Sequence, residues 1–342
     1  MPNEVLTEAI ERVASGQDLT ADEAAGVLHE IMAGNASQAQ TAGFLVALRT
    51  KGETVAEIAG LARTMRELAL RVDAEGPLID TAGTGGGRPT FNVSTTAAFV
   101  VAAAGCRVAK HGNRSATGRC GSADVLEALG ARIDLEPGAV ADCIDSLGFG
   151  FMFAPSHHTA MRHVVPARKE LGVRTIFNFL GPLTNPAGAT RQVIGVSERP
   201  YLETLAAALR ELGTESALVV SSADGLDELS ASGATRVVEL KRGKLESYDV
   251  MPEQVGLDPA PPLTADWNGT PERNAEVARS VLGGDRGPER SLTVLNAGAA
   301  IYVGGAADTI EAGVRRAEET LEGGGALELM QRYVERSKGL AR

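Results

Sequence analysis

The chain has 342 residues, of which 44% are hydrophobic and 23% charged, enough apolar material for the cores of about two domains. Its net charge of −11 argues against general nucleic-acid binding, because an acidic surface repels phosphate backbones. No apolar run approaches the roughly 20 residues of a membrane helix, and the charged N-terminus lacks a signal-peptide core. The three cysteines have no metal-binding or disulfide-framework spacing, so a cytoplasmic protein is expected.

The first 70 residues are expected to be helical. An amphipathic pattern through Val5, Ile10 and Val13 predicts the first helix. Three capping boxes follow, each a Ser or Thr with Glu or Gln three residues later. They predict helices over 21–32, 38–48 and 55–70, and the pairs are Thr20 with Glu23, Ser37 with Gln40, and Thr54 with Glu57. The segment Phe44–Leu48 is apolar on more than one face, so we expect it to pack against its own domain and against another subunit.

After Gly76, short apolar strands alternate with helices, which favours an α/β domain with a largely parallel sheet. We expect strands over 78–81, 107–109, 149–153, 192–196 and 217–221. The intervening patterns predict helices over 95–104, 123–129, 139–147 and 201–212. Segments 236–240 and 245–250 should form a β-hairpin with a three- to four-residue loop around Gly243. The end is helical again, over 273–282, 291–302, 309–321 and 326–337.

A glycine-rich segment, Asp80–Gly87, follows the first of these strands and leads through Asn92–Thr95 into a helix. This arrangement is typical of phosphate sites, because glycines let backbone N–H groups face an anion and the helix dipole adds positive potential. The segment is neither a Walker loop nor a dinucleotide-binding fingerprint. The plainer interpretation is a glycine turn before a helix that Ser94 and Thr95 cap.

A second loop, Lys110–Ser122, also lies between a strand and a helix. It places three cationic side chains, Lys110, Arg114 and Arg119, among hydroxyls and glycines, a composition that suits phosphate oxygens. The alternative is a solvated basic turn. Both loops would lie at the carboxyl ends of adjacent strands, where open α/β sheets bind ligands.

Two further segments carry candidate chemistry. Asp227 and Glu228 follow the strand at 217–221 and suit Mg²⁺, although acidic pairs in loops are mostly solvated. Three histidines lie between residues 157 and 163, but His158 and His163 miss the spacing of one helical face, which disfavours zinc. Arg168, in the same stretch, is a candidate for binding a carboxylate-bearing or aromatic substrate, and the alternative is an ordinary charged helix face.

Taken in order, these motifs resemble the anthranilate phosphoribosyltransferase family of tryptophan biosynthesis, over almost the whole chain. The matching segments are Gly83–Gly86, Asn92–Thr95, Lys110–Ser115, Gly121–Gly130, Arg168–Gly172, Arg174–Pro186 and Asp224–Glu228. The resemblance implies a fold shared with pyrimidine nucleoside phosphorylases. A small helical domain would combine residues 1–72 with about 157–185, and an α/β domain with a mostly parallel sheet would hold 76–156 and about 190–342. A homodimer through the helical domains is implied, with a hinge near residues 73–76.

The implied reaction joins anthranilate to 5-phosphoribosyl 1-diphosphate (PRPP), and releases diphosphate. By similarity, PRPP lies on the two loops and the helix start between them, at Gly83, Gly86, Gly87, Thr90, Asn92, Ser94, Thr95, Lys110, Gly112, Asn113, Arg114, Ser115, Gly118 and Ser122. Two Mg²⁺ ions, one of them bridging the diphosphate, are implied at Ser94, Asp227 and Glu228. The implied anthranilate contacts are Gly83, His111, Asn113, His158 and Arg168. Lys110, His111 and Arg168 are the expected catalytic residues.

One position departs from the family pattern. The glycine-rich loop of the family usually ends in Asp, whereas this chain has Gly87, and the loop to Asn92 is a residue shorter than in some members. A missing carboxylate is expected to change the dependence on Mg²⁺. Two alternatives remain open at this point: a pyrimidine nucleoside phosphorylase, and a non-catalytic, nucleic-acid-binding relative of the same fold.

Overall fold

The computed structural model describes residues 1–115, 118–263, 267 and 269–340. It begins with a bundle of four helices, α1 (Glu4–Ala14), α2 (Ala21–Met32), α3 (Gln38–Lys51) and α4 (Val55–Glu67). Two capping boxes are confirmed, at Thr20 and at Thr54. Ser37 caps α3, but the side chain of Gln40 bonds to the backbone of Asn3 instead of closing the third box. That prediction is therefore half right, because a contact with α1 competes for the glutamine.

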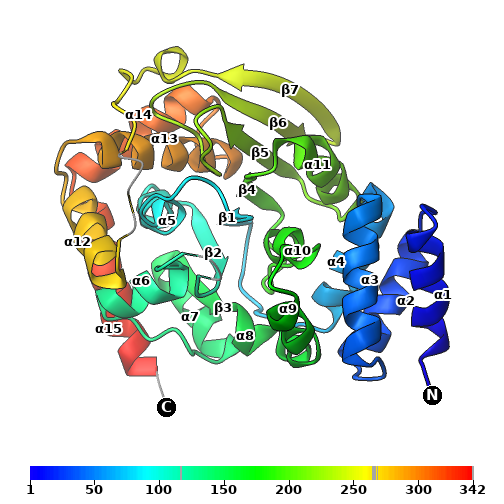
Figure 1. The fold of residues 1–342 in the computed structure, drawn as a ribbon. Helices are drawn as coiled ribbons and strands as arrows, with labels where there is room; N and C mark the ends of the chain where they lie inside the picture. The colour runs from blue at the N-terminus through cyan, green and yellow to red at the C-terminus, as the bar shows by residue number, and fades with distance from the viewer. Residues whose placement is uncertain (116–117, 264–266, 268, 341–342) are drawn as a thin grey trace.

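The rest of the chain is built on a seven-stranded sheet (Figure 1). The strands are β1 (Leu78–Gly83), β2 (Arg107–Gly112), β3 (Phe149–Phe153), β4 (Arg191–Gly195), β5 (Ser216–Ser222), β6 (Thr235–Lys241) and β7 (Lys244–Val250). Their order in the sheet is β3-β2-β1-β4-β5-β6-β7. The first five strands in this order are parallel, whereas β6 pairs antiparallel with both β5 and β7. The predicted fold class, a helical part plus a mostly parallel α/β sheet, is confirmed.

Strands β1 and β2 run well past their predicted ends at residues 81 and 109. β1 continues to Gly83, which pairs with Gly195, and β2 continues to Gly112, which pairs with Phe153. The expected hairpin loop is wrong in length: only Arg242 and Gly243 separate β6 from β7. Both residues have positive φ, +52° and +75°, the left-handed backbone that two-residue hairpin loops require.

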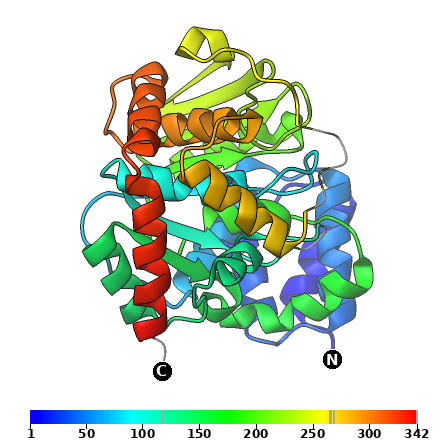
Figure 2. The same ribbon diagram turned by 90° about the vertical axis from the view of Figure 1, so that its left-hand side faces the viewer.

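Helices cover both faces of the sheet (Figures 1 and 2). On one face α5 (Val93–Ala103) contacts β1 and β2, and α13 (Pro288–Val303) contacts β4 and β5. On the other, α11 (Leu202–Glu211) joins β5 and β6 to α4 of the bundle. The remaining helices are α6 (Ser122–Leu129), α7 (Pro137–Leu147), α8 (Ala154–His157), α9 (Val165–Leu171), α10 (Phe177–Leu183), α12 (Pro271–Leu282), α14 (Ile310–Glu322) and α15 (Gly325–Leu340), with short 3₁₀ turns η1 (Thr159–His163), η2 (Arg199–Tyr201) and η3 (Pro252–Val255).

Segments from the middle of the chain pack on the N-terminal bundle. α9 contacts α3, η1 contacts α2 and α10 contacts α4. The chain therefore crosses between bundle and sheet three times. Backbone hydrogen bonds join these crossings, from Leu70 to His157 (2.9 Å) and from Val72 to Pro186 (3.2 Å). The proposed division into two domains stays a prediction. No helix in the described part of the chain is long and apolar enough to cross a membrane.

Candidate functional site

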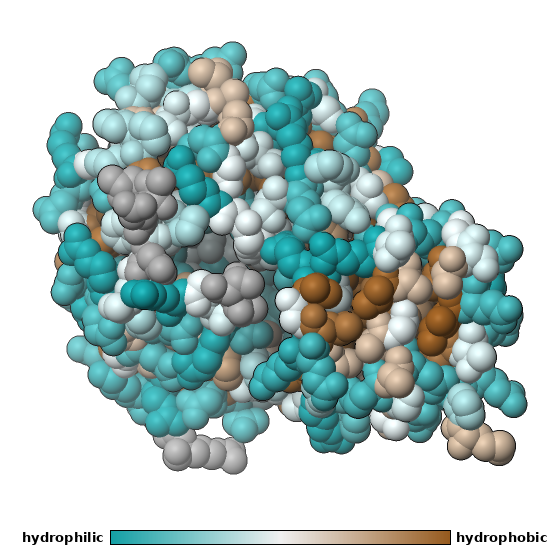
Figure 3. Space-filling model, viewed as in Figure 1, coloured by the Kyte–Doolittle hydropathy of each residue, from teal (hydrophilic) through white to brown (hydrophobic). Residues whose placement is uncertain are grey.

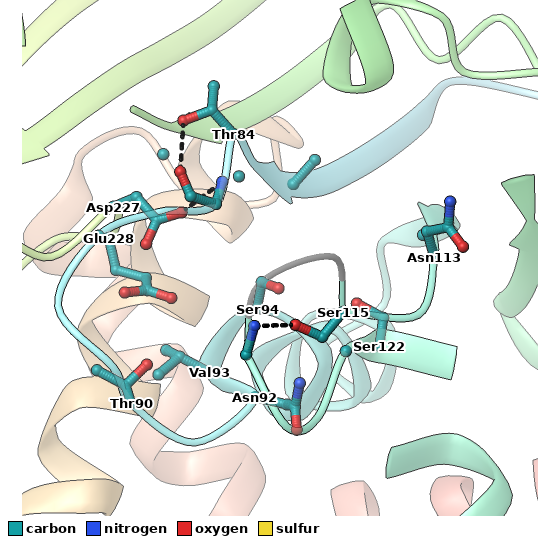
Figure 4. A pocket seen from close by; sticks show the side chains of 18 of the residues that line it. Thr84, Thr90, Asn92, Val93, Ser94, Asn113, Ser115, Ser122, Asp227 and Glu228 are labelled. Atoms are coloured by element: carbon teal, nitrogen blue, oxygen red, sulfur yellow. Dashed lines mark hydrogen bonds between the residues drawn. The ribbon is translucent and has the colours of Figure 1, made fainter. Parts of the chain in front are cut away.

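A cleft of about 570 Å³ opens at the carboxyl ends of β1, β2, β4 and β5 (Figure 4). β1 and β4 are neighbours in the sheet although β2 and β3 come between them in sequence. Such a switch point is where open α/β sheets bind ligands, because the loops after the two strands diverge there. All the predicted site residues line this cleft except Thr95 and His158. The opposite wall comes from α9 and α10, including Arg168, Phe177 and Asn178.

The glycine-rich loop is hydrogen-bonded to the end of β4 and to the turn that follows β5. The Thr84 N–H donates to Gly195 O (2.8 Å), and the Arg88 N–H donates to Gly225 O (2.7 Å). Gly85 and Gly86 have left-handed φ values of +66° and +84°. A Cβ atom on Gly86 would also collide with the guanidinium of Arg174. The backbone conformation therefore requires glycine at both positions, and at Gly86 a side chain would also displace Arg174.

Asp227 and Glu228 are half-buried in the wall of the cleft beside this loop. The Gly85 N–H donates to Asp227 Oδ2 (2.9 Å), and Glu228 Oε2 has no hydrogen-bond partner among the described residues. Desolvation raises the pKa of both carboxyls, and for Glu228 the neighbouring Asp227 and Asp224 raise it further. Two adjacent, partly desolvated carboxyls, one of them with a buried oxygen that has no partner among the described residues, are costly unless a cation joins them.

This donor set fits a magnesium ion. Mg²⁺ takes one or two carboxylates and completes its shell with water or phosphate oxygens. No group of three or more His, Cys, Asp or Glu side chains that could hold a metal occurs in residues 1–115, 118–263, 267 and 269–340. Further ligands would have to come from hydroxyls, such as Ser94 on the same cleft, or from a bound phosphate (Figure 4).

The start of α5 offers free backbone donors to the cleft. Asn92 is the N-cap, but its side chain makes no capping hydrogen bond and instead contacts Cys120. The plainer interpretation, in which Ser94 and Thr95 cap this helix, is not what the structure has, because both lie within its first turn. Uncapped N–H groups at the positive end of a helix favour an anion.

Lys110 lies at the inner end of the cleft, with its side chain fully buried. Its Nζ donates to Thr81 O (2.5 Å) and, more weakly, to Ser94 Oγ (3.4 Å). Desolvation lowers the pKa of Lys110 to about 8, and the charge of Asp80 opposes that shift. Asp80 accepts from the His111 N–H (3.2 Å) and from Asn185 Nδ2 (2.7 Å). Lys110 thus stays mostly protonated at pH 7, beside the first turn of α5.

In the second loop, the structure places Arg114 differently from the oxyanion-binding expectation. Its guanidinium bonds to Asp124 (2.7 Å) and Glu127 (2.5 Å) of α6. Its N–H donates to Asn113 Oδ1 (2.7 Å), so both its side chain and its backbone donor are engaged. Ser115 accepts from the Gly118 N–H (2.7 Å) at the cleft edge. Residues 116 and 117, within the expected donor stretch, lie outside the described residues.

His111 and His158 are neutral in this environment. Desolvation and the nearby His158 lower the pKa of His111 well below its usual value. Desolvation lowers the pKa of His158 to about 4. Their ring centroids are 5.1 Å apart. His111 Nδ1 contacts Gly181 O (3.2 Å), and His158 Nε2 contacts Thr184 O (3.1 Å). His111 therefore faces the cleft, and His158 supports it from outside the lining.

Arg168 belongs to α9 and lines the cleft. Its guanidinium carbon lies 5.3 Å from the ring centroid of Phe177, and burial lowers its pKa. No hydrogen bond to its side chain is found among the residues that the structure describes. The three histidines of this stretch contact different groups: His157 Nδ1 contacts Leu70 O, and His163 Nε2 accepts from Arg162 Nε.

Sequence reasoning missed several residues that shape this site. Arg88 pairs with Asp224 (3.3 Å), and Asp224 also accepts from Ser230 and Ser232. The Asn296 side chain of α13 bonds to both backbone groups of Leu229, the residue after Glu228. Its Oδ1 accepts from the Leu229 N–H, and its Nδ2 donates to the Leu229 carbonyl. Arg174 bonds to the glycine-rich loop from the opposite wall. Each depends on partners more than 60 residues away, except Ser230 and Ser232, so no local motif marks them.

Comparison with known proteins places the chain among phosphoribosyltransferases. Residues 75–327 match the a/b domain of the glycosyl transferase family, and residues 7–69 match its helical bundle domain. The chain is 52% identical over 339 residues to an anthranilate phosphoribosyltransferase of Rubrobacter xylanophilus, covering 98% of this chain and 99% of the relative. A Methanocorpusculum labreanum protein of the same name is 48% identical over 98% of this chain and 99% of its own length.

Solved structures agree with this comparison. The Thermus thermophilus anthranilate phosphoribosyltransferase matches with a TM-score of 0.89 and 46% identity, over 96% of this chain and 99% of that one. The Saccharomyces cerevisiae enzyme, in complex with PRPP and Mg, matches with a TM-score of 0.87 and 26% identity, over 98% of both chains. The same yeast enzyme has also been solved in complex with 4-fluoroanthranilate.

Proposed function

Because this chain belongs to the anthranilate phosphoribosyltransferase family, we propose specific roles in that reaction for the residues of its cleft. The enzyme transfers the 5-phosphoribosyl group of PRPP to the amino group of anthranilate and releases diphosphate. One observation carries the assignment of a PRPP-binding (donor) side and an anthranilate-binding (acceptor) side to the cleft. The glycine-rich loop, the start of α5 and the Asp227–Glu228 pair form one wall, and Arg168 with His111 and Phe177 faces them.

The donor side is suited to diphosphate. We assign its contacts to the N–H groups of the glycine-rich loop, the uncapped N-terminus of α5, and the edge of the second loop through Asn113, Ser115 and Ser122. Lys110 holds a positive charge behind Ser94, where it stabilises negative charge on the departing group. The Arg114 guanidinium, already paired with Asp124 and Glu127, would act by holding the loop rather than by binding phosphate.

Magnesium fits the acidic pair and completes the donor side. When bound, Mg²⁺ would neutralise charge on the diphosphate leaving group. Asp227 and Glu228, with Ser94, are the proposed protein ligands, and the unpartnered Oε2 of Glu228 supports this. We propose two ions, one of them bridging the diphosphate, as in the implied family arrangement. Because this cleft offers few carboxylates, most ligands of a second ion would come from PRPP and water.

The acceptor side is suited to an aromatic carboxylate. The Arg168 guanidinium can bind the anthranilate carboxylate in a bidentate manner, and Phe177 holds it in place by cation–π contact. The amine of anthranilate is already nucleophilic, so catalysis needs orientation more than a strong base. Neutral His111, with Nε2 unpartnered among the described residues, can accept the amine proton as the new bond forms.

A direct assay tests these roles. Purified protein would be mixed with anthranilate, PRPP and Mg²⁺, and the loss of anthranilate fluorescence followed. We expect loss that needs both substrates, stops with EDTA, and weakens in Arg168→Ala and Asp227→Ala, with the exposed Lys169→Ala as the matched control. Phosphorolysis of uridine or thymidine without this activity would favour a nucleoside phosphorylase instead, although no observation here supports it.

A homodimer is proposed from an exposed apolar patch on the bundle. The space-filling view shows hydrophobic side chains gathered over α1, α3 and α9 (Figure 3). The exposed hydrophobic residues of this face are Val5, Val46 (42% exposed), Val165 and Val173 (53% exposed). A second copy of the chain would cover such a patch. Light scattering should give twice the chain mass, and Val46→Glu should lower it, whereas Leu70→Glu elsewhere should not. A cytoplasmic location is proposed from the biosynthetic activity.

A further inference from the structure

Arg174 connects the two walls of the cleft. It lies between α9 and α10, on the acceptor side, yet its Nη1 donates to Gly85 O (2.7 Å) and its Nη2 to Thr84 O (3.3 Å). Its Nε donates to Glu198 Oε1 (3.0 Å), and its own carbonyl accepts from Arg49 of α3. One residue is therefore bonded to the glycine-rich loop, to the turn after β4 and to the helical bundle.

These contacts fix the orientation of two peptide groups. In a planar trans peptide, the carbonyl and the following N–H point in opposite directions. The Thr84 carbonyl faces Arg174, and the Gly85 N–H on the other side of that peptide donates to Asp227 Oδ2 (2.9 Å). The Gly85 carbonyl accepts from Arg174 and from Ser197 Oγ (2.8 Å), so the Gly86 N–H points away from both. That N–H has no hydrogen-bond partner within the described part of the chain.

We propose that Arg174 is a positioning residue for donor binding, which holds the Gly85–Gly86 peptide so that the Gly86 N–H is presented to the diphosphate of PRPP. The inference rests on the donor role proposed above for the glycine-rich loop. Glycine at 86 is compatible with this role, because φ is +84° there and a Cβ atom would displace the guanidinium from the loop. The role also requires arginine, because two carbonyls and a carboxylate are bound at once by a planar fork that lysine lacks.

The position of Arg174 gives this contact a second effect. Arg174 lies six residues beyond Arg168, the proposed anthranilate-binding residue, in the segment that follows α9. The donor loop and the acceptor wall are therefore tied together at one side chain. Loss of the tie should disturb PRPP binding directly, and anthranilate binding only through the altered wall.

The test compares Arg174→Met and Arg174→Lys with Arg199→Met, a matched control at an exposed arginine beside Glu198. Steady-state kinetics would separate KM for PRPP, KM for anthranilate and kcat, and calorimetry would measure binding of PRPP with Mg²⁺. We expect Arg174→Met to weaken PRPP binding and raise its KM about 10- to 100-fold, as for a lost charged hydrogen-bond pair. KM for anthranilate should change less than about threefold. Arg174→Lys should recover only part of the loss, and added guanidinium ion should partly rescue Arg174→Met.

A second variant keeps the inference testable if Arg174→Met folds poorly. Ser197→Ala removes the other donor to the Gly85 carbonyl and should raise KM for PRPP by a smaller factor, about 2- to 5-fold. Equal losses for both substrates, or a lower melting temperature with unchanged KM for PRPP, would show a merely structural role and overturn the proposal. Failure of the donor assignment itself looks different: wild-type protein would then bind no PRPP, and the role of Arg174 would fall with it.

Discussion

A Cβ atom placed on Gly87 would lie 2.6 Å from Asp227 Oδ1 and 2.8 Å from the Asp227 nitrogen. The residue that departs from the family pattern is thus packed directly against the proposed metal ligand. The Gly225 carbonyl oxygen would lie 3.0 Å from the same Cβ atom. No side chain therefore fits at position 87 unless the 224–228 turn shifts. The absence of aspartate at 87 and the tight junction of the two loops are therefore linked.

This contact predicts the behaviour of Gly87→Asp. We expect the variant to be more sensitive to excess Mg²⁺ than the wild-type enzyme, since a third carboxylate would join Asp227 and Glu228. Gly87→Ala introduces the same collision without the charge and serves as the control. Rate would be measured against Mg²⁺ concentration for all three proteins. Identical curves for wild type and Gly87→Asp would contradict the idea, and equal changes in both variants would assign the effect to packing.

Arg168 should set the affinity for anthranilate. Arg168→Lys keeps the charge but loses the bidentate fork, and we expect kcat/KM for anthranilate to fall by roughly 10- to 100-fold. PRPP affinity should change little, because Arg168 lies on the opposite wall. Substituting aniline for anthranilate would provide the complementary check. If wild type and Arg168→Lys discriminate equally between the two amines, Arg168 does not bind the carboxylate.

Glu228 and Asp224 should affect stability in opposite directions. Glu228→Gln removes a half-buried carboxyl beside Asp227, whose Oε2 is buried and has no partner among the described residues, so we expect the metal-free protein to melt higher, by roughly 2–4 °C, while transferase activity is lost. Asp224→Asn instead breaks bonds to Arg88 and two serines that stabilise its charged form, and it should melt lower. Differential scanning calorimetry with EDTA would measure both. A lower melting temperature for Glu228→Gln would contradict the assignment.

His158 should make stability depend on pH. Its folded pKa of about 4 lies below the usual value of 6.5, so between these values the unfolded chain binds more protons than the folded one. The His158 contribution is therefore complete above pH 6.5 and is lost as pH falls toward 4. His158→Gln can still donate to Thr184 O and should show a flatter decline of melting temperature over that range. Parallel declines for the two proteins would rule out His158 as the cause.

The sequence predicted elements better than it predicted partners. Capping boxes and alternating patterns located the helices and strands, because these signals are local. β1 and β2 were predicted too short because glycine ends strand patterns, yet Gly83 and Gly112 stay paired in the sheet. The glycines and charges of the two candidate phosphate loops pointed to segments that line one cleft. The ion pairs of Arg114 could not be predicted, because Asp124 and Glu127 come within its reach only once α6 has folded beside the loop.

The three hydrogen-bonded crossings between bundle and sheet limit how the molecule can move. Leu70, Val72, His157 and Pro186 are joined through their backbones, so the two parts cannot slide past each other without breaking these bonds. Arg174 adds a further link, since its side chain bonds to the glycine-rich loop while its carbonyl accepts from Arg49 of α3. A movement that separates the bundle from the glycine-rich loop would therefore have to break the contacts of Arg174 as well as strain the backbone crossings.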